Sequence, residues 1–408
     1  MQSLDRSHLT ECILSVNRCL FLPFPIIFFR SRKMPLSTAT SKLLDGASTL
    51  NGRLADLHQH LLQVLPDVDR IACALYNAND DTLKTFINST RTGEAIEGYE
   101  YKLSDSGSLS DLARTGEFRV LDNIASAVHA SNMHSKWLLK QGYQSSFTVP
   151  IYDQGSLLGF VFFDSMQAFA FTPTVQRDLV LYCSLISMSI SNEMGAVRTM
   201  VESIRIAREL TMMRDFETGK HLERMAQYSR LIAKYVAPRL HLSDEVVEHV
   251  YMFAPLHDIG KIGIPDYILL KPGKLTQDEQ KIMDSHVELG VKLIERISGS
   301  GGATRLPDSS ILMNIVKSHH EALDGSGYPQ GLKGADVPIE ARIVMVADIF
   351  DALTAERPYK SIWSTADALT ELQSLAAAGK VDALCVEALV SNLDQILTIQ
   401  HKYSDTVA

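Results

Sequence analysis

Hydrophobic positions in the first half of the chain alternate between helical and strand spacing. Residues 51–65 carry apolar side chains at helical intervals, and residues 175–194 do so again. Between them, residues 70–90 and residues 145–165 each show the β-rich composition and central turn of a hairpin. Helix, hairpin, variable middle, hairpin and closing helix predict an α+β domain over residues 50–195.

The pattern then becomes helical almost without interruption. No proline stands between Pro173 and Pro238, and residues 175–235 read as nearly continuous helix. A helix of this length between domains indicates a paired helix and a dimer. The alternative is two helices broken near Gly195 or Gly219. Helical patterns dominate after Pro238, so the expected fold is multidomain: an α+β domain, a long joining helix and an all-α bundle.

These shifts suggest domain boundaries. The expected parts are a leader and linker over 1–49, an α+β domain over 50–195, a connecting helix over 196–216 and a helical domain over 217–408. Within the leader, "CLFLPFPIIFF" is too short for a membrane span, which needs about 20 apolar residues. We interpret the first 33 residues as a mis-assigned start or a disordered leader, with a short membrane-associating segment as the alternative.

Composition limits the classes of partner and compartment. Hydrophobic residues make up 46% and charged residues 21% of the chain, which is ordinary for a globular protein. A net charge of −9 gives no general attraction to nucleic acid or anionic membranes. The five cysteines are dispersed without CxxC spacing, so they form neither a disulfide framework nor a thiolate metal site. A cytoplasmic location is therefore expected.

The C-terminal half contains an unusual set of side chains that can bind metal ions. Two pairs are adjacent in sequence, His257 with Asp258 and His319 with His320, and one pair is spaced at i, i+4. Any one of these histidines alone would more simply be a surface or core residue. Together they supply ligands for two or three metals. The set is Glu217, His221, His257, Asp258, His286, His319, His320 and Asp348, all on predicted helices.

The composition of this set indicates the metal and the reaction. Imidazole and carboxylate without thiolate suit iron, manganese or zinc at a hydrolytic centre. Asp258 is the candidate bridge between two ions. Metals about 3.5–4 Å apart suit phosphodiester cleavage, because they polarise phosphoryl oxygens and lower the pKa of water. Lys261, one turn beyond His257, is expected to neutralise charge on the phosphate or to help the leaving oxygen.

Five blocks in order then resemble the HD-GYP phosphodiesterases over about residues 205–365. They are "RDFETGKH", "LHDIGKIGIPD", "HVELG", "HHEALDGSGYPQGLKG" and "ARIVMVADIFDALTAERPYK". The resemblance implies hydrolysis of cyclic di-GMP to pGpG, GMP or both, with two or three divalent metal ions. Iron is the first choice, and manganese or others are alternatives. It also implies that Glu217 allows a third metal.

The same resemblance assigns roles beyond metal binding. Asp258 and Lys261 are the expected catalytic residues. The implied substrate contacts are Asp215, Lys261, Tyr328, Arg357 and Lys360. The loop around the Gly-Tyr-Pro sequence is further implied to recognise diguanylate cyclase (GGDEF) domains, with capping of the site as its simpler role. We expect Gly325, Gly327 and Gly331 to adopt backbone angles that other residues resist.

The N-terminal pattern "SSFTVPIYDQGSLLGFVFFDS" resembles a GAF domain. Such a domain is expected to bind an unknown small ligand and to tune hydrolysis through the connecting helix; a dimerisation module with an empty pocket is the alternative. For the catalytic half, two other functions stay open. One is hydrolysis of another cyclic dinucleotide, and the other is a nucleotide-sensing scaffold that binds diguanylate cyclases.

Overall fold

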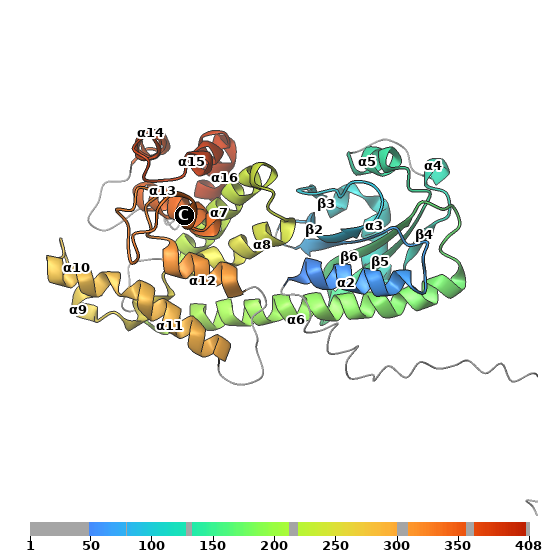
Figure 1. Ribbon diagram of the computed structural model, residues 1–408, viewed down its shortest axis with the longest axis horizontal. Helices are drawn as coiled ribbons and strands as arrows, with labels where there is room; N and C mark the ends of the chain where they lie inside the picture. Colours follow the sequence, from blue (N-terminus) through green and yellow to red (C-terminus); the bar gives the residue numbers. More distant parts are fainter. Residues whose placement is uncertain are drawn as a thin grey trace, which may run out of the picture. The chain divides into compact units, whose positions relative to one another are not determined.

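The computed structural model describes residues 49–78, 80–127, 133–211, 219–299, 309–355 and 363–404 (Figure 1). The predictions for the leader and linker and for most of the glycine-rich loop at 298–310 lie outside these residues.

The N-terminal domain is built on a six-stranded antiparallel sheet with the order β3-β2-β1-β6-β5-β4. Both predicted hairpins are confirmed, and they supply the four longest strands. The strands are β1 Arg70–Asn77, β2 Thr82–Thr90, β3 Glu100–Lys102, β4 Arg119–Leu121, β5 Ser145–Asp153 and β6 Ser156–Ser165. The helices are α2 Leu50–Leu62, α3 Gly107–Thr115, α4 Ile124–Ala127, α5 Met133–Gln141 and α6 Pro173–Thr211, with the 3-10 turn η1 Leu103–Asp105.

Helices α2 and α6 pack on one face of this sheet, as Figure 1 shows. Leu179, Cys183, Ile186 and Ile190 recur at helical spacing along α6 and are at most 4% exposed. Burial of each of these leucine and isoleucine side chains contributes about 1.5–3 kcal/mol. On the other face, α3 contributes a smaller cluster, including Leu109, that encloses a cavity described below.

Helix α6 is unbroken through Gly195, so the alternative of a break at that glycine is wrong. The next helix, α7, begins at Gly219. Residues 212–218 lie outside the described residues, and continuity between α6 and α7 therefore stays a prediction.

The regular structure in the described part of the C-terminal half is helical, as the sequence predicted. Its core is lined by α7, α8, α12, α13 and α15, and α13 lies at its centre with Ile343, Val346 and Phe350 fully buried. The α-helices are α7 Gly219–Leu240, α8 Asp244–Phe253, α9 Asp266–Leu269, α10 Gln277–Asp284, α11 His286–Gly299, α12 Ser309–Ser318, α13 Ile339–Thr354, α14 Thr365–Ala377, α15 Ala383–Val390 and α16 Leu393–Lys402. The 3-10 turns are η2 Ala254–Leu256, η3 Ile259–Gly263 and η4 Gly334–Asp336.

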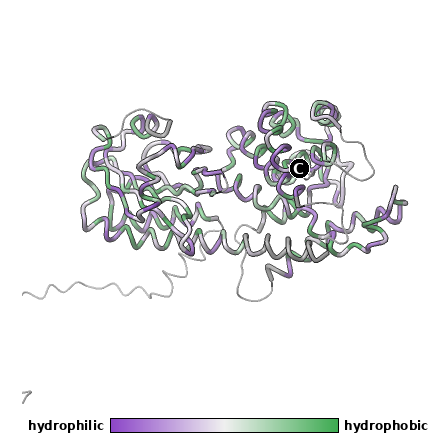
Figure 2. The backbone as a smooth tube through the Cα atoms, turned by 180° about the vertical axis from the view of Figure 1, so that it is seen from behind, coloured by the Kyte–Doolittle hydropathy of each residue, from purple (hydrophilic) through white to green (hydrophobic). Residues whose placement is uncertain are grey.

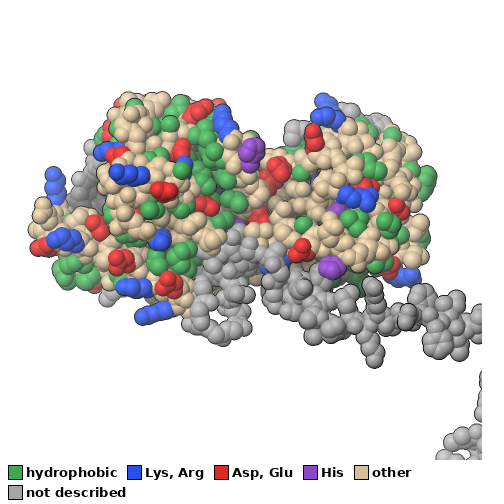
Figure 3. Space-filling model, viewed as in Figure 1, with side chains coloured by type: hydrophobic (Ala, Val, Ile, Leu, Met, Phe, Trp, Pro, Cys, Tyr) green, Lys and Arg blue, Asp and Glu red, His purple; other side chains and the backbone are tan. Residues whose placement is uncertain are grey.

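Hydropathy along the backbone matches this arrangement. Hydrophobic and hydrophilic residues alternate along the helices in Figure 2, as amphipathic packing requires. On the face shown in Figure 3, Lys and Arg side chains lie among Asp and Glu rather than gathering in one basic field. No helix among the described residues has both the length and the apolar character needed to cross a membrane.

Candidate metal centre

Seven of the eight predicted ligands lie in the described residues, and the structure brings them together. His221 lies in the first turn of α7, His286 begins α11, and Asp348 lies on α13. Their ligand atoms form two groups, in each of which all atoms lie within 4.8 Å of one another. One group is Asp258, His286, His319 and His320, and the other is His221, His257 and Asp348. Glu217 lies outside the described residues.

The expectation that all ligands lie on helices is wrong for both adjacent pairs. His257 and Asp258 lie in the junction between η2 and η3, and His319 and His320 lie in the turn that follows α12. Neighbouring side chains on an α-helix point about 100° apart, because there are 3.6 residues per turn. A turn removes this constraint. The ring centroids of His319 and His320 are 4.1 Å apart.

Asp258 connects the two groups. Its Oδ2 lies 3.1 Å from Nε2 of His257, which belongs to the second group. Its Oδ1 lies 3.1 Å from Nε2 of His286 and 3.6 Å from Nε2 of His319. The two oxygens of one carboxylate therefore face different groups, as a bridging ligand would require.

Hydrogen bonds to the backbone fix the orientation of three imidazoles. The Nδ1 atoms of His257 and His286 donate to carbonyl oxygens at 2.8 Å, and that of His319 does so at 3.1 Å. A carbonyl oxygen accepts only, so Nδ1 carries a proton, and in the neutral ring the lone pair is then on Nε2. This is the arrangement that metal-binding histidines show in proteins.

Two residues that the sequence analysis missed orient the fourth imidazole. His221 Nδ1 donates to Oδ2 of Asp351 at 2.7 Å. Arg224 donates to the same carboxylate through Nε at 2.6 Å. Burial raises the pKa of Asp351, but these two hydrogen bonds outweigh burial and lower it. Their spacing in the sequence could have revealed both residues. Arg224 and Asp351 each follow a predicted ligand by three residues and share its helix face.

The electrostatics of the site favour the protonation states that metal ligands need. Burial raises the pKa of Asp258, but the charge of Lys261, at 2.7 Å from Oδ2, is the largest of the effects that together hold it well below its usual value. Burial lowers the pKa of His319, and it lowers the pKa of His320 to about 2. The carboxylate is thus charged and both imidazoles are neutral.

The residues present fit divalent metal ions. Among the described residues, Asp258 Oδ1, His286 Nε2 and His319 Nε2 are buried and make no hydrogen bond. Leaving such groups unsatisfied is costly, at about 1–3 kcal/mol each and more for a charged one. An oxygen and two imidazole nitrogens in one buried group are the donor set of a hydrolytic iron, manganese or zinc centre.

Close packing around the site depends on two glycines. A Cβ on Gly260 would lie 1.8 Å from the carbonyl oxygen of His286, so η3 packs directly on α11. A Cβ on Gly327 would lie 2.2 Å from Ala322 N, and the prediction that Gly327 needs an unusual backbone angle is wrong. Gly327 is needed because its backbone lies too close to the backbone of Ala322 to leave room for a side chain. Gly325 and Gly331 do have positive φ angles, of 84° and 67°.

The Gly-Tyr-Pro loop folds against the site and is held by Glu321, a further residue that the sequence analysis missed. The buried Glu321 carboxylate accepts from the backbone N–H groups of Gln330 at 2.6 Å and Leu332 at 2.9 Å. Tyr328 stacks on the His320 ring, with centroids 4.7 Å apart. Burial raises the pKa of Tyr328, which keeps the phenol protonated as a hydrogen-bond donor.

Comparison with known proteins identifies both halves of the chain. Residues 213–384 match the family model described as HD domain, and residues 50–190 match that described as GAF domain. The chain contains a GAF domain followed by an HD domain. The resemblance to a GAF sensor joined to an HD-type phosphodiesterase is thus confirmed at the level of these two domains.

Several proteins with named activities are similar to this chain. The cyclic di-GMP phosphodiesterase response regulator RpfG of Xanthomonas campestris pv. campestris is 45% identical over 205 residues, which are 50% of this chain and 50% of that protein. A cyclic di-GMP phosphodiesterase of Thermotoga maritima is 40% identical over 205 residues, 50% of this chain and 52% of that protein. The 3'3'-cGAMP-specific phosphodiesterase 2 of Vibrio cholerae is 39% identical over 193 residues, 47% of this chain and 34% of that protein. The chain therefore matches about half or less of each relative's length.

Some predicted residues of the HD domain cannot be placed. Asp215, Glu217, Arg357 and Lys360 lie outside the described residues, so the third metal and part of the substrate site stay predictions. Lys261 and Tyr328, the other two predicted substrate contacts, lie beside the first ligand group.

Proposed function

We propose that the chain is a metal-dependent phosphodiesterase that hydrolyses cyclic di-GMP to pGpG, GMP or both. The observation that carries this proposal is the position of Asp258, with one oxygen toward each of two ligand groups. The similarity of the chain to proteins named cyclic di-GMP phosphodiesterases supports the choice of substrate.

The residues have separate tasks in this proposal. The nitrogen ligands are His257, His286, His319 and His320, and Asp258 offers the shared carboxylate. When bound, divalent metal ions polarise the phosphoryl oxygens and lower the pKa of the attacking water. Lys261 keeps Asp258 ionised and supplies positive charge at the edge of the site. Tyr328 offers a protonated hydroxyl to a phosphate oxygen.

The remaining parts of the site are proposed from the sequence. Asp215, Arg357 and Lys360 are proposed substrate contacts, because a guanidinium forks onto phosphate and an ammonium acts as a point charge. Glu217 is proposed as a ligand of a third metal. Iron is the proposed native metal, with manganese as the alternative.

The test pairs two isosteric substitutions of aspartate. Asp258→Asn is expected to lose metal, measured by mass spectrometry of anaerobically purified protein, and to lose hydrolysis of cyclic di-GMP. Asp278→Asn, at an exposed position on α10, is expected to keep both. Full turnover by Asp258→Asn would contradict the proposal.

A second substrate is supported by one comparison. Because the relative named a 3'3'-cGAMP-specific phosphodiesterase is 39% identical, hydrolysis of another cyclic dinucleotide is the alternative function. Parallel assays of cyclic di-GMP and 3'3'-cGAMP at equal enzyme and metal concentrations decide between them. We propose cyclic di-GMP as the preferred substrate, and faster turnover of 3'3'-cGAMP would reverse that order.

We also propose that the protein is a homodimer paired through α6. On α6, Leu181, Leu185 and Met188 are 67%, 48% and 61% exposed. Their spacing of four and then three residues is that of a coiled-coil seam. This seam lies on α6 apart from the buried positions that cover the sheet, so a second copy of the same helix is the proposed occupant.

Two remaining proposals concern partner and compartment. The Gly-Tyr-Pro loop is the proposed contact for diguanylate cyclase domains, and nucleic acid is not a proposed partner. Cys73, Cys183 and Cys385 are free and buried. This supports a reducing compartment, and we propose the cytoplasm.

A further inference from the structure

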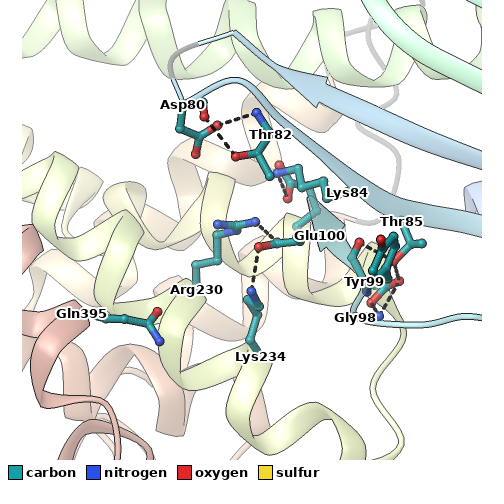
Figure 4. Close-up of polar contacts among 12 residues, drawn as sticks. Asp80, Thr82, Lys84, Thr85, Gly98, Tyr99, Glu100, Arg230, Lys234 and Gln395 are labelled. Carbon is teal, nitrogen blue, oxygen red and sulfur yellow. Dashed lines mark hydrogen bonds and ion pairs between the residues drawn. The ribbon is translucent and has the colours of Figure 1, made fainter. Parts of the chain in front are cut away.

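The GAF domain contacts the HD domain through a partly buried set of polar side chains. Lys84 on β2 pairs with Glu248 on α8 at 2.5 Å, and Thr85 donates to Asp244 on α8 at 2.5 Å. Glu100 on β3 pairs with Arg230 on α7, and it accepts from Lys234 on α7 at 2.8 Å. Figure 4 shows Arg230 and Lys234 pointing toward the Glu100 carboxylate.

A second contact lies where α2, α6 and α8 meet. Glu245 on α8 accepts from the backbone N–H groups of Leu50 at 2.6 Å and Asn51 at 3.0 Å. Glu193 on α6 pairs with Arg53 and lies 3.3 Å from His249. An arginine and two backbone donors already compensate these carboxylates. We therefore assign no metal to the cluster of Glu193, Glu245 and His249.

Both helices on the HD side lead to the candidate metal centre. Arg230 lies nine residues after His221 on α7, and Glu248 lies nine residues before His257. At about 1.5 Å per residue along a helix, Arg230 is roughly 14 Å from His221. A shift of α7 at Arg230 therefore reaches a predicted ligand through one rigid element.

On the GAF side, the same strands line a cavity. The cavity has a volume of about 150 Å³, and its lining includes Arg70, Tyr99, Tyr101, Leu109, Arg119 and Asp164. Tyr101 pairs with Leu83 across the β2–β3 ladder, and Glu100 pairs with Lys84. Successive residues of a strand face opposite sides. Thus β3 presents Tyr101 to the cavity and Glu100 to α7, and Tyr99 stacks on Tyr101 with centroids 5.9 Å apart.

The charges in the cavity indicate the class of ligand. Arg70 pairs with Asp164 at 2.5 Å, which neutralises both. Arg119 donates only to the hydroxyls of Ser108, at 2.7 Å, and Thr148, at 3.2 Å, within the described part of the chain. Its Nε makes no hydrogen bond there and is shielded from solvent. A guanidinium that donates to neutral hydroxyls and keeps a spare donor favours an anion, and a carboxylate matches its geometry.

Size and lining restrict the ligand further. A cavity of about 150 Å³ holds a ring the size of benzene, whereas a nucleotide is larger. The cavity offers apolar and aromatic surface to a ligand of this size through Tyr99, Tyr101 and Leu109. The fitting molecule is a small organic carboxylate with a compact apolar part.

We propose that β3 couples the two domains: a small organic carboxylate held by Arg119 and packed on Tyr99 and Tyr101 shifts Glu100, and thereby α7. The part of this proposal that concerns regulation of hydrolysis rests on the proposed function. The ligand-induced shift of α7 does not depend on it. This route differs from the expected one through the connecting helix, because it crosses from strand to helix by side-chain contacts.

Binding is tested with benzoate on the full chain, with benzamide as the uncharged isostere. Calorimetric titration is expected to give heat of binding for benzoate and none for benzamide. Arg119→Gln is expected to weaken benzoate binding at least about tenfold, as loss of a hydrogen bond to a charged group does. Arg114→Gln, at an exposed position on α3, is expected to change nothing. Equal affinity for benzoate and benzamide would overturn the ligand class.

Coupling is tested by amide hydrogen exchange in α7 with and without benzoate. Exchange at residues 219–240 is expected to change at least about fivefold in the wild type, within the usual range of coupling between sites. Glu100→Gln is expected to keep benzoate binding and to lose this change, and Glu94→Gln, an exposed control, to keep both. An unchanged α7 response in Glu100→Gln would overturn the coupling. Because exchange is read without substrate, absence of cyclic di-GMP hydrolysis would contradict only the proposed function.

Discussion

His221 and Asp351 join α7 to α13 through a buried hydrogen bond, with Nδ1 of the imidazole donating to the carboxylate at 2.7 Å. This bond holds the other ring nitrogen toward the group that contains His257 and Asp348. Arg224 holds the carboxylate from its other side. The ligand geometry of the second group therefore depends on a residue that is not itself a predicted ligand.

Asp351→Asn is expected to lower metal affinity about 10- to 100-fold, because the carboxylate no longer fixes the imidazole. It also leaves Arg224 buried without its full partner, which costs about 3–5 kcal/mol of unfolding free energy. Metal titration of the folded apoprotein measures the first effect. Asp382→Asn, which disturbs the pair with Arg342 at 3.2 Å, is the control and is expected to leave metal affinity unchanged. Equal affinities in the two variants would argue against an orienting role.

Gly260→Ala is expected to destabilise the protein and to displace His286, because the new Cβ would meet the His286 carbonyl oxygen at 1.8 Å. Overpacking of this kind costs about 1–3 kcal/mol or more. The control is Gly195→Ala on α6, where a Cβ meets nothing within 4 Å. That substitution is expected to add up to about 1 kcal/mol of stability, since alanine favours helix over glycine. Urea unfolding measures both, and a neutral Gly260→Ala would contradict the packing argument.

The interdomain pair of Glu100 is expected to make stability depend on pH. Burial raises the pKa of Glu100, but Arg230 and Lys234 outweigh burial and lower it from its ordinary value of 4.5. Because the folded pKa is lower than the unfolded one, folding favours the carboxylate. The stabilisation is fully present above the ordinary pKa and is lost as pH falls through the folded pKa. Urea midpoints between about pH 6 and pH 3 should fall more steeply in the wild type than in Glu100→Gln. Parallel curves would exclude this contribution.

Leu185→Glu is expected to dissociate the proposed dimer, because it places a charge in the exposed seam of α6. Sedimentation or light scattering should report half the mass at micromolar concentration. Val64→Glu, at a position that is 67% exposed outside the seam, should leave the mass unchanged. A wild-type chain that is already monomeric at these concentrations would refute pairing through α6.

The longer elements could be predicted from the sequence because their periodicity extends over many residues. The strands β1, β2, β5 and β6 have eight to ten residues each, which is enough for a hairpin pattern. The strands β3 and β4 have three residues each and show no period, so both were missed. Glu100, the centre of the proposed coupling, lies on one of these short strands.

The site was predictable in composition and not in detail. Ligand-type residues in an otherwise apolar context could be found by inspection, since a buried histidine or carboxylate needs a partner. Their convergence is set by tertiary packing. That His257, Asp258, His319 and His320 lie in turns could not be inferred from helical spacing. The orienting residues Arg224, Glu321 and Asp351 look like ordinary charged residues in the sequence, because their hydrogen bonds join distant segments.

The central claim is that one carboxylate, Asp258, serves two metal ions. The most direct measurement is anomalous X-ray scattering at the iron and manganese edges from crystals grown anaerobically. The account predicts two peaks about 3.5–4 Å apart, one on each side of Asp258. A single peak that Asp258 does not contact, or peaks confined to one ligand group, would contradict it.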